Sequence, residues 1–236
     1  MIVAAAADTT EVQRRIAAVR RPRPVLDRAR AEALTARQRE LLDELSELFS
    51  GGFAHLTMAE IAAALNCSLR TLYGLAPSRE ELVLMVVDRR LWDVGRTARQ
   101  AVPETPVSSA VDAIRAYLAA AHVAVSRTTE AFARDMATVP GGAELAAAHS
   151  NYLVAVTTEL LDWAVERREI APVDTAALAH VVAGLGRTLT RPEVIASLAS
   201  TPREATDHLV DVILRGLTAG TGRSRRASHH PDPSEK

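Results

Sequence analysis

The sequence contains one cysteine, almost no net charge and no long apolar run. The single cysteine, Cys67, excludes a disulfide framework and any metal or iron–sulfur site built from several thiolates, and it fits a reducing cytoplasm. No run approaches the ~20 apolar residues that span a bilayer, so no membrane segment is expected. With 48% hydrophobic residues and a net charge of −1 over 236 residues, bulk disorder is also excluded.

Strand signals are missing as well. No run strictly alternates apolar and polar residues, and no Asn-Gly or Asp-Gly hairpin turn occurs. Capping-box patterns mark several helix starts: Thr35-x-x-Gln38, Thr57-x-x-Glu60, Ser78-x-x-Glu81 and Thr201-x-x-Glu204. We therefore predict an all-α fold, with helices at about 36–51, 58–65, 69–75, 79–98, 106–127, 129–138, 142–169, 174–189, 192–199 and 202–217.

Charge is distributed unevenly along the chain. Residues 12–39 hold nine arginines and two acids, a balance of +7, which leaves −8 for the rest of the chain. A basic arm on an acidic body is typical of a protein that touches a polyanion at one end. Arg20, Arg21 and Arg23 are the best candidates, because Pro22 and Pro24 keep the segment extended. The alternative is a solvated, disordered leader.

Three short helices near the N-terminus form a recognisable group. The first carries an apolar stripe made of Leu41, Leu42, Leu45, Leu48 and Phe49. The next two, at 58–65 and 69–75, are too short to be stable alone and are joined by only three residues, 66–68. Asn66 tolerates the positive φ that such a turn needs. This arrangement predicts a helix-turn-helix.

The stretch 57–82, TMAEIAAALNCSLRTLYGLAPSREEL, resembles the DNA-binding signature of the TetR/AcrR family of bacterial one-component regulators. The resemblance covers about 37–84, and its most specific parts are Ser68-x-x-Thr71-Leu72-Tyr73 and the run from Pro77 to Leu82. It implies an N-terminal three-helix DNA-binding domain and a C-terminal helical bundle for ligand binding and dimerisation. The expected domains are a basic extension 1–34, the helix-turn-helix domain 35–82, the bundle 83–218 and a disordered tail 219–236.

The family pattern assigns roles in DNA binding. It implies that the phosphate backbone is contacted by Thr57, Ser68, Tyr73 and Arg79. It implies that base edges are met by Arg70, with Leu69, Thr71, Gly74 and Leu75 at the groove floor. The sequence departs from the family at Gly74-Leu75-Ala76, where a bulky polar residue and then an aromatic residue are usual.

The family also implies a ligand cavity and a dimer interface in the bundle. Candidate pocket residues are Trp92, Tyr117, His122, Phe132, Met136, His149, Tyr152 and Trp163. Candidate interface residues are Ala176, Ala183, Gly184, Leu209, Val212, Ile213 and Leu217. An alanine-rich lining with few charges suggests an apolar or amphipathic effector.

These features together predict a cytoplasmic, ligand-responsive DNA-binding regulator. We expect a homodimeric repressor that a small effector releases from a pseudo-palindromic operator, without metal, cofactor, membrane contact or enzymatic activity. One alternative is a helical ligand-binding and dimerisation module that has lost DNA binding, which the run 74–76 would favour. The other is an all-helical enzyme, for which Gly184-Leu-Gly186 is a weak dinucleotide-loop signal without a preceding strand.

Overall fold

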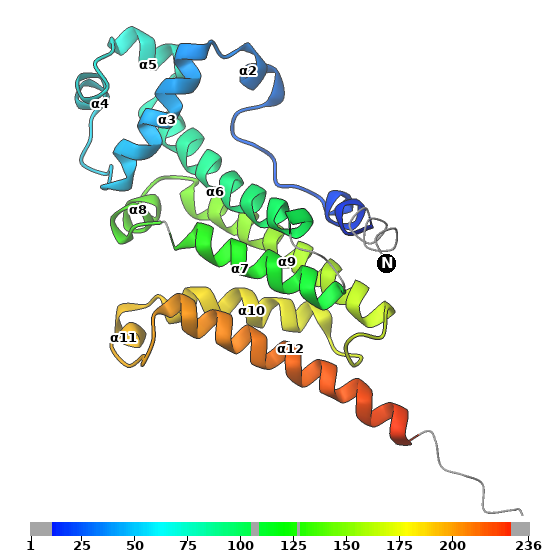
Figure 1. Cartoon of the computed structure of the whole chain (residues 1–236). Helices are drawn as coiled ribbons and strands as arrows, with labels where there is room; N and C mark the ends of the chain where they lie inside the picture. The colour runs from blue at the N-terminus through cyan, green and yellow to red at the C-terminus, as the bar shows by residue number, and fades with distance from the viewer. Residues whose placement is uncertain (1–10, 105–108, 127, 228–236) are drawn as a thin grey trace, which may run out of the picture. The chain divides into compact units, whose positions relative to one another are not determined.

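The computed structural model describes residues 11–104, 109–126 and 128–227, and all regular structure in these ranges is helical (Figure 1). A helical segment over 11–18 precedes α2 (Arg28–Ala33), α3 (Ala36–Ser50), α4 (Met58–Ala64), α5 (Leu69–Leu75), α6 (Arg79–Glu104), α7 (Ala110–Val125), α8 (Glu130–Met136), α9 (Gly142–Glu166), α10 (Thr175–Leu189), α11 (Pro192–Ile195) and α12 (Pro202–Ala227). The expected all-α fold is confirmed. None of the described helices is long and apolar enough to cross a membrane.

Local side-chain chemistry begins the helices where the sequence predicted it. At the start of α3 the Thr35 hydroxyl accepts the Gln38 N–H, and the Gln38 side chain accepts the Thr35 N–H. The same box forms before α4 and α12, and Ser78 accepts the N–H of Glu81 before α6. These contacts satisfy N–H groups that a helix start would otherwise leave unpaired.

The chain's two ends differ most from expectation. The predicted basic extension 1–34 contains the helical segment 11–18 and α2, and residues 1–10 lie outside the described part. The predicted tail 219–236 overlaps α12, which continues to Ala227; residues 228–236 are not described. Helix α11 is shorter than the predicted 192–199.

The described residues form two compact units. One, which we call the HTH unit, comprises residues 21–96, 124–126 and 128–151; the other, the bundle unit, comprises residues 11–20, 97–104, 109–123 and 152–227. The predicted boundary at 82/83 differs, because most of α6 and all of α8 pack with the helix-turn-helix. Both α6 and α9 begin in the HTH unit and end in the bundle unit.

The core of the HTH unit is built from α3, α4, α5, α6 and α8 (Figure 1). Three aromatic rings pack in sequence through this core. The ring centroids of Phe49 and Phe53 are 4.9 Å apart, and those of Phe53 and Phe132, which meet edge to face, are 5.5 Å apart. The Arg90 guanidinium lies 4.2 Å from the centre of the Phe132 ring. This aromatic group fixes the loop between α3 and α4 against α8.

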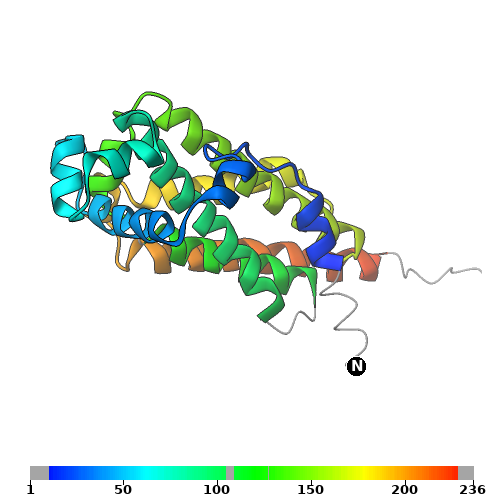
Figure 2. The ribbon, with the colours of Figure 1, turned by 90° about the horizontal axis from the view of Figure 1, so that it is seen from above.

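The core of the bundle unit is built from the end of α6, α7, the later part of α9, α10 and α12, together with Val12 and Ile16 of the helical segment 11–18. Helices α10 and α12 pack side by side, as Figures 1 and 2 both show. The backbone N–H of Ala171 donates to the Leu217 carbonyl, which ties the loop after α9 to α12. Tyr117 and Leu160 are fully buried in this core, and Trp163 is almost so.

Candidate nucleic-acid interface

Helices α4 and α5 form a compact helix-turn-helix. Asn66 takes a φ of 47° in the turn, the left-handed conformation expected from the sequence. The Ser68 hydroxyl accepts the Thr71 N–H and starts α5. Ile61 and Leu72 are fully buried between the helices and the rest of the HTH unit. The turn and the cap therefore fix how α5 leaves α4.

One face of α5 is exposed although it carries large apolar side chains. Leu69 is 44% exposed and Tyr73 is 52% exposed, and Arg70 and Gly74 beside them are exposed too. A Cβ placed on Gly74 would meet no atom within 4 Å. An exposed surface of Leu, Arg and Tyr on a helix-turn-helix has the composition of a groove-reading face.

Leu75 does not belong to that face. Its side chain is 3% exposed and lies in the core of the HTH unit. The expectation that Leu75 contacts a base is therefore corrected: its side chain packs inward. Ala76 is 1% exposed, which shows that small and apolar side chains close the core after α5 without the usual aromatic residue. Thr71 is half-buried, and its hydroxyl lies 2.8 Å from that of Ser68.

Two expected phosphate contacts have other partners. The Arg79 guanidinium donates to the carbonyls of Leu56 (2.5 Å), Phe53 (2.7 Å) and Ala54 (3.1 Å). Arg79 therefore braces the loop between α3 and α4, and its expected phosphate contact stays a prediction. The hydroxyl of Thr57 is exposed but is occupied in the capping box of α4.

Asp135 of α8 binds backbone N–H groups of the same loop. One of its oxygens accepts the N–H groups of Phe53 (2.5 Å) and Ala54 (2.8 Å). The bond from Ala54, with that from Phe53, holds the pKa of this carboxyl below its ordinary range against the opposing effect of burial. Arg79 and Asp135 thus satisfy the carbonyls and the N–H groups of one loop.

Replacing Asp135 by asparagine is expected to lower stability at pH 7 by roughly 1 kcal/mol, since a half-exposed carboxylate loses charge-assisted bonds. Because the pKa of Asp135 is lower in the folded state than in the unfolded state, its carboxylate stabilises the fold fully above the unfolded-state pKa, about 4. This stabilisation is lost as the pH falls from there through the folded-state pKa. Thermal unfolding at pH 7, 5, 4 and 3 should show the difference from wild type shrinking at the lowest pH. Asp43→Asn, which removes an exposed ion pair with Arg89, is the control and should change little at any pH.

The arginines expected to meet a polyanion are exposed. Arg20, Arg21 and Arg23 lie between the helical segment 11–18 and α2, in a stretch without regular secondary structure.

The eight candidate pocket residues are divided between the two units. Trp92, Phe132, Met136 and His149 belong to the HTH unit, whereas Tyr117, His122, Tyr152 and Trp163 belong to the bundle unit. Phe132 and Met136 pack against the helix-turn-helix core, which corrects their assignment to a ligand wall.

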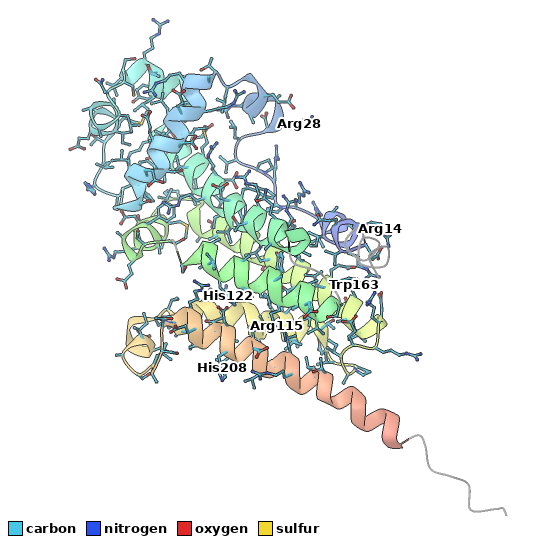
Figure 3. All side chains as sticks on the ribbon, viewed as in Figure 1. Arg14, Arg28, Arg115, His122, Trp163 and His208 are labelled. Carbon is cyan, nitrogen blue, oxygen red and sulfur yellow. The ribbon has the colours of Figure 1, made fainter. Side chains whose placement is uncertain are left out.

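Both candidate pocket histidines already have acidic partners. His149 lies 2.7 Å from Asp88 of α6, with both side chains 5% exposed, and the Trp92 ring meets His149 edge-on at 5.0 Å. In the bundle unit His122 of α7, which Figure 3 labels, lies 2.8 Å from Asp207 of α12. These pairs join helices to each other, and sequence spacing gave no sign of them.

The interface candidates lie on α10 and α12, but only some of them are exposed. Leu209 is 38% exposed and Val212 is 49% exposed, while Ala176 is exposed and Ala183 half-buried. A Cβ on Gly184 would meet nothing within 4 Å. Ile213 and Leu217 are partly buried against the core of the bundle unit itself. The sequence analysis missed Val181 of α10, which is 55% exposed.

Among the described residues no three His, Cys, Asp or Glu side chains form a group that could hold a metal ion. Cys67 is a half-buried free thiol in the turn between α4 and α5, packed against the core of the HTH unit.

Comparison with known proteins identifies the fold. No protein-family model and no curated protein matches the sequence. Among solved structures, a transcriptional regulator from Cytophaga hutchinsonii ATCC 33406 aligns with a TM-score of 0.60 at 14% identity, over 79% of this chain and 98% of that one. A bacterial regulatory protein in the TetR family from Rhodococcus RHA1 aligns with a TM-score of 0.57 at 18% identity, over 78% and 98%.

A third similar structure is the TetR-family transcriptional regulator PfmR from Thermus thermophilus, with a TM-score of 0.54 at 21% identity, over 75% of this chain and 98% of that one. Each similar structure is covered almost completely, so the likeness extends well beyond the helix-turn-helix. The fold that the motif at 57–82 implied is confirmed: this chain has the fold of the TetR-family transcriptional regulators.

Proposed function

We propose that this protein is a non-catalytic, DNA-binding transcriptional regulator that acts as a homodimer. The observation that carries the proposal is the exposed face of α5, where Leu69, Arg70 and Tyr73 stand free of the HTH core. Binding of this face in a major groove would explain why apolar side chains are exposed to water on α5. The buried Leu75 and Ala76 support this reading, because they keep α5 packed despite the departure from the family pattern.

Arg70 reads bases and Tyr73 contacts a phosphate in this proposal. Arg70 can bind the O6 and N7 atoms of a guanine with both arms of its guanidinium, and the methyl groups of Leu69 suit a thymine methyl. The N-terminal end of α5, capped by Ser68, offers backbone N–H groups to the phosphate backbone.

Selection of duplexes from a random-sequence pool by the full-length protein tests the proposal. We expect enrichment of a pseudo-palindrome whose half-sites lie one or more helical turns apart, about 34 Å each, because two copies of α5 are related by a twofold axis. Gel-shift with the DNA upstream of its own gene should show a specific complex. If the selection enriches no sequence and the gel-shift shows no complex, the proposal is wrong, and the alternative of a helical module that has lost DNA binding is favoured.

We further propose repression relieved by an apolar or amphipathic effector that binds in the bundle unit. The Tyr117 hydroxyl has no hydrogen-bond partner in the described part of the chain, and burial raises the pKa of this phenol, so it is a neutral donor in an apolar core. Helix α6 is the proposed transmitter because it begins in the HTH unit and ends in the bundle unit. Linkage requires that effector and operator weaken each other equally, typically by 1–3 kcal/mol.

The two tryptophans allow this coupling to be followed, since Trp92 lies in the HTH unit and Trp163 in the bundle unit. Single-tryptophan variants titrated with a small-molecule library should reveal an effector through Trp163 and its transmission through Trp92. An effector that releases DNA while changing neither signal would place the route elsewhere.

A further inference from the structure

The N-terminal extension is fixed to the bundle unit at its outer end. Val12 and Ile16 are 0% and 1% exposed and lie in the core of that unit. Arg15 is bound by Glu11 of its own helical segment (2.7 Å) and by Glu159 (2.9 Å) and Glu166 (2.5 Å), both of α9. In Figure 2 this segment, in dark blue, lies beside the later part of α9. The segment 11–18 is therefore a folded part of the protein, not a free leader.

The extension is fixed again, to the HTH unit, at its inner end. The backbone N–H of Val25 donates to Asp88 over 2.8 Å, and the other oxygen of Asp88 contacts His149. Leu26 and Leu34 pack partly buried against the core of the HTH unit, and Asp27 caps α2 by accepting the N–H of Arg30. Only residues 20–24, Arg-Arg-Pro-Arg-Pro, lie between the two fixed ends; we call them the arginine bridge.

The arginines of the extension fall into two classes. Those outside the bridge are paired with carboxylates: Arg14 with Glu11, Arg15 with Glu11, Glu159 and Glu166, Arg28 with Glu32, and Arg30 with Glu81. Within the described part of the chain, Arg20, Arg21 and Arg23 of the bridge are exposed and have neither an ion pair nor a side-chain hydrogen bond. Figure 3 labels Arg14 and Arg28, one on each helix that bounds the bridge. Among the described arginines of the extension, the folded structure thus neutralises those outside the bridge and leaves these three.

The bridge is suited to a linear polyanion. Pro22 and Pro24 have fixed φ and no N–H, so the segment stays extended, and five residues at about 3.1 Å each span roughly 15 Å. Double-stranded DNA presents a negative charge every ~1.7 Å of its axis, and a guanidinium forms paired hydrogen bonds with a phosphate. Because the two prolines already restrict the backbone of this segment, little chain entropy is lost on binding.

We propose that the arginine bridge binds the sugar–phosphate backbone of double-stranded DNA, as a sequence-independent contact additional to α5. The inference rests on the proposed function, since DNA is favoured as the polyanion by the groove-reading face of α5. It replaces the expectation of a free arm with a short contact between two folded segments, the helical segment 11–18 and α2.

The test compares two triple variants of the full-length protein with equal changes of charge. One is Arg20→Gln/Arg21→Gln/Arg23→Gln; the other is Arg14→Gln/Arg28→Gln/Arg37→Gln, whose arginines are exposed but paired with acids. Fluorescence anisotropy measures the dissociation constant for a selected duplex and for a random duplex between 50 and 300 mM salt. If each bridge arginine meets a phosphate, a dimer loses six contacts, and the log–log salt slope should fall by roughly 5 on both duplexes.

The second triple variant should keep the wild-type slope to within about one contact, since its arginines are already neutralised. Preference for the selected over the random duplex should survive in both variants, because the bridge reads no bases. Equal slopes in all three proteins, or an equal fall in both variants, would overturn the inference while leaving α5 as the reader. Wild-type protein that bound neither duplex would instead overturn the proposed function.

Discussion

Arg70→Ala is expected to weaken binding to the selected duplex by about 1–3 kcal/mol, roughly 5- to 150-fold, and to flatten the base preference at one position of each half-site. Arg70 is the second residue of α5, is exposed, and has no ion pair in the described part of the chain. Its removal therefore leaves the HTH core unchanged, and thermal unfolding should be that of wild type. Anisotropy titrations and a repeated selection measure both effects.

Tyr73→Phe is the matched comparison on the same face. It removes a single hydroxyl, which is proposed to contact a phosphate, so the affinity for selected and random duplexes should fall alike. An Arg70→Ala variant that lost affinity equally for selected and random DNA would show that Arg70 also serves only the backbone, and another residue of α5 would have to read the bases.

The features that sequence predicted well are those with a local cause. A capping box needs only the residues at its two ends, so the starts of α3 and α4 could be placed from Thr35 and Thr57. The positive φ of Asn66 follows from its side chain and from a turn too short for any other geometry. The helix-turn-helix could therefore be predicted from the sequence alone.

The contacts that sequence did not predict depend on which distant segment packs nearby. Arg79 braces carbonyls of a loop more than twenty residues earlier, and Phe132 of α8 enters the HTH core. Asp88 follows a run of apolar residues at 82–87 that is almost wholly buried, which is the available signal that it lies inside the unit. Its partner His149 could not be inferred, because nothing local relates the two positions.

The N-terminal extension shows how charge can hide an apolar pattern. Its arginines suggested a solvated arm, yet Val12, Ile16 and Val19 recur at i, i+4 and i+7, the spacing of one helix face. In the structure Val12 and Ile16 are buried and Val19 is half-buried, all against the bundle core. Composition predicted the charge of this segment, and periodicity was the signal for its packing.

The exposed apolar side chains of α10 and α12 form the proposed dimer interface. Val181 of α10 and Val212 of α12 are 55% and 49% exposed, and Leu209 adjoins Val212 on the same helix. Gly184 leaves open space on α10, which allows two copies to approach closely. A twofold interface buries the same face from each protomer, so each of these side chains occurs there twice.

Leu209→Arg and Val212→Arg should each convert the protein to monomers, because an unpaired charge buried in an apolar interface costs about 3–5 kcal/mol, and the twofold axis places two there. Light scattering reports the mass, and anisotropy should show loss of tight binding to the selected duplex, since one protomer holds one half-site. Val125→Arg is the control: Val125, at the end of α7, is 45% exposed but lies off α10 and α12, so this variant should still dimerise. Ile213 is a poor choice because its side chain packs against its own core. Leu209→Arg and Val212→Arg proteins that remained dimeric and bound DNA as wild type does would place the interface on another face.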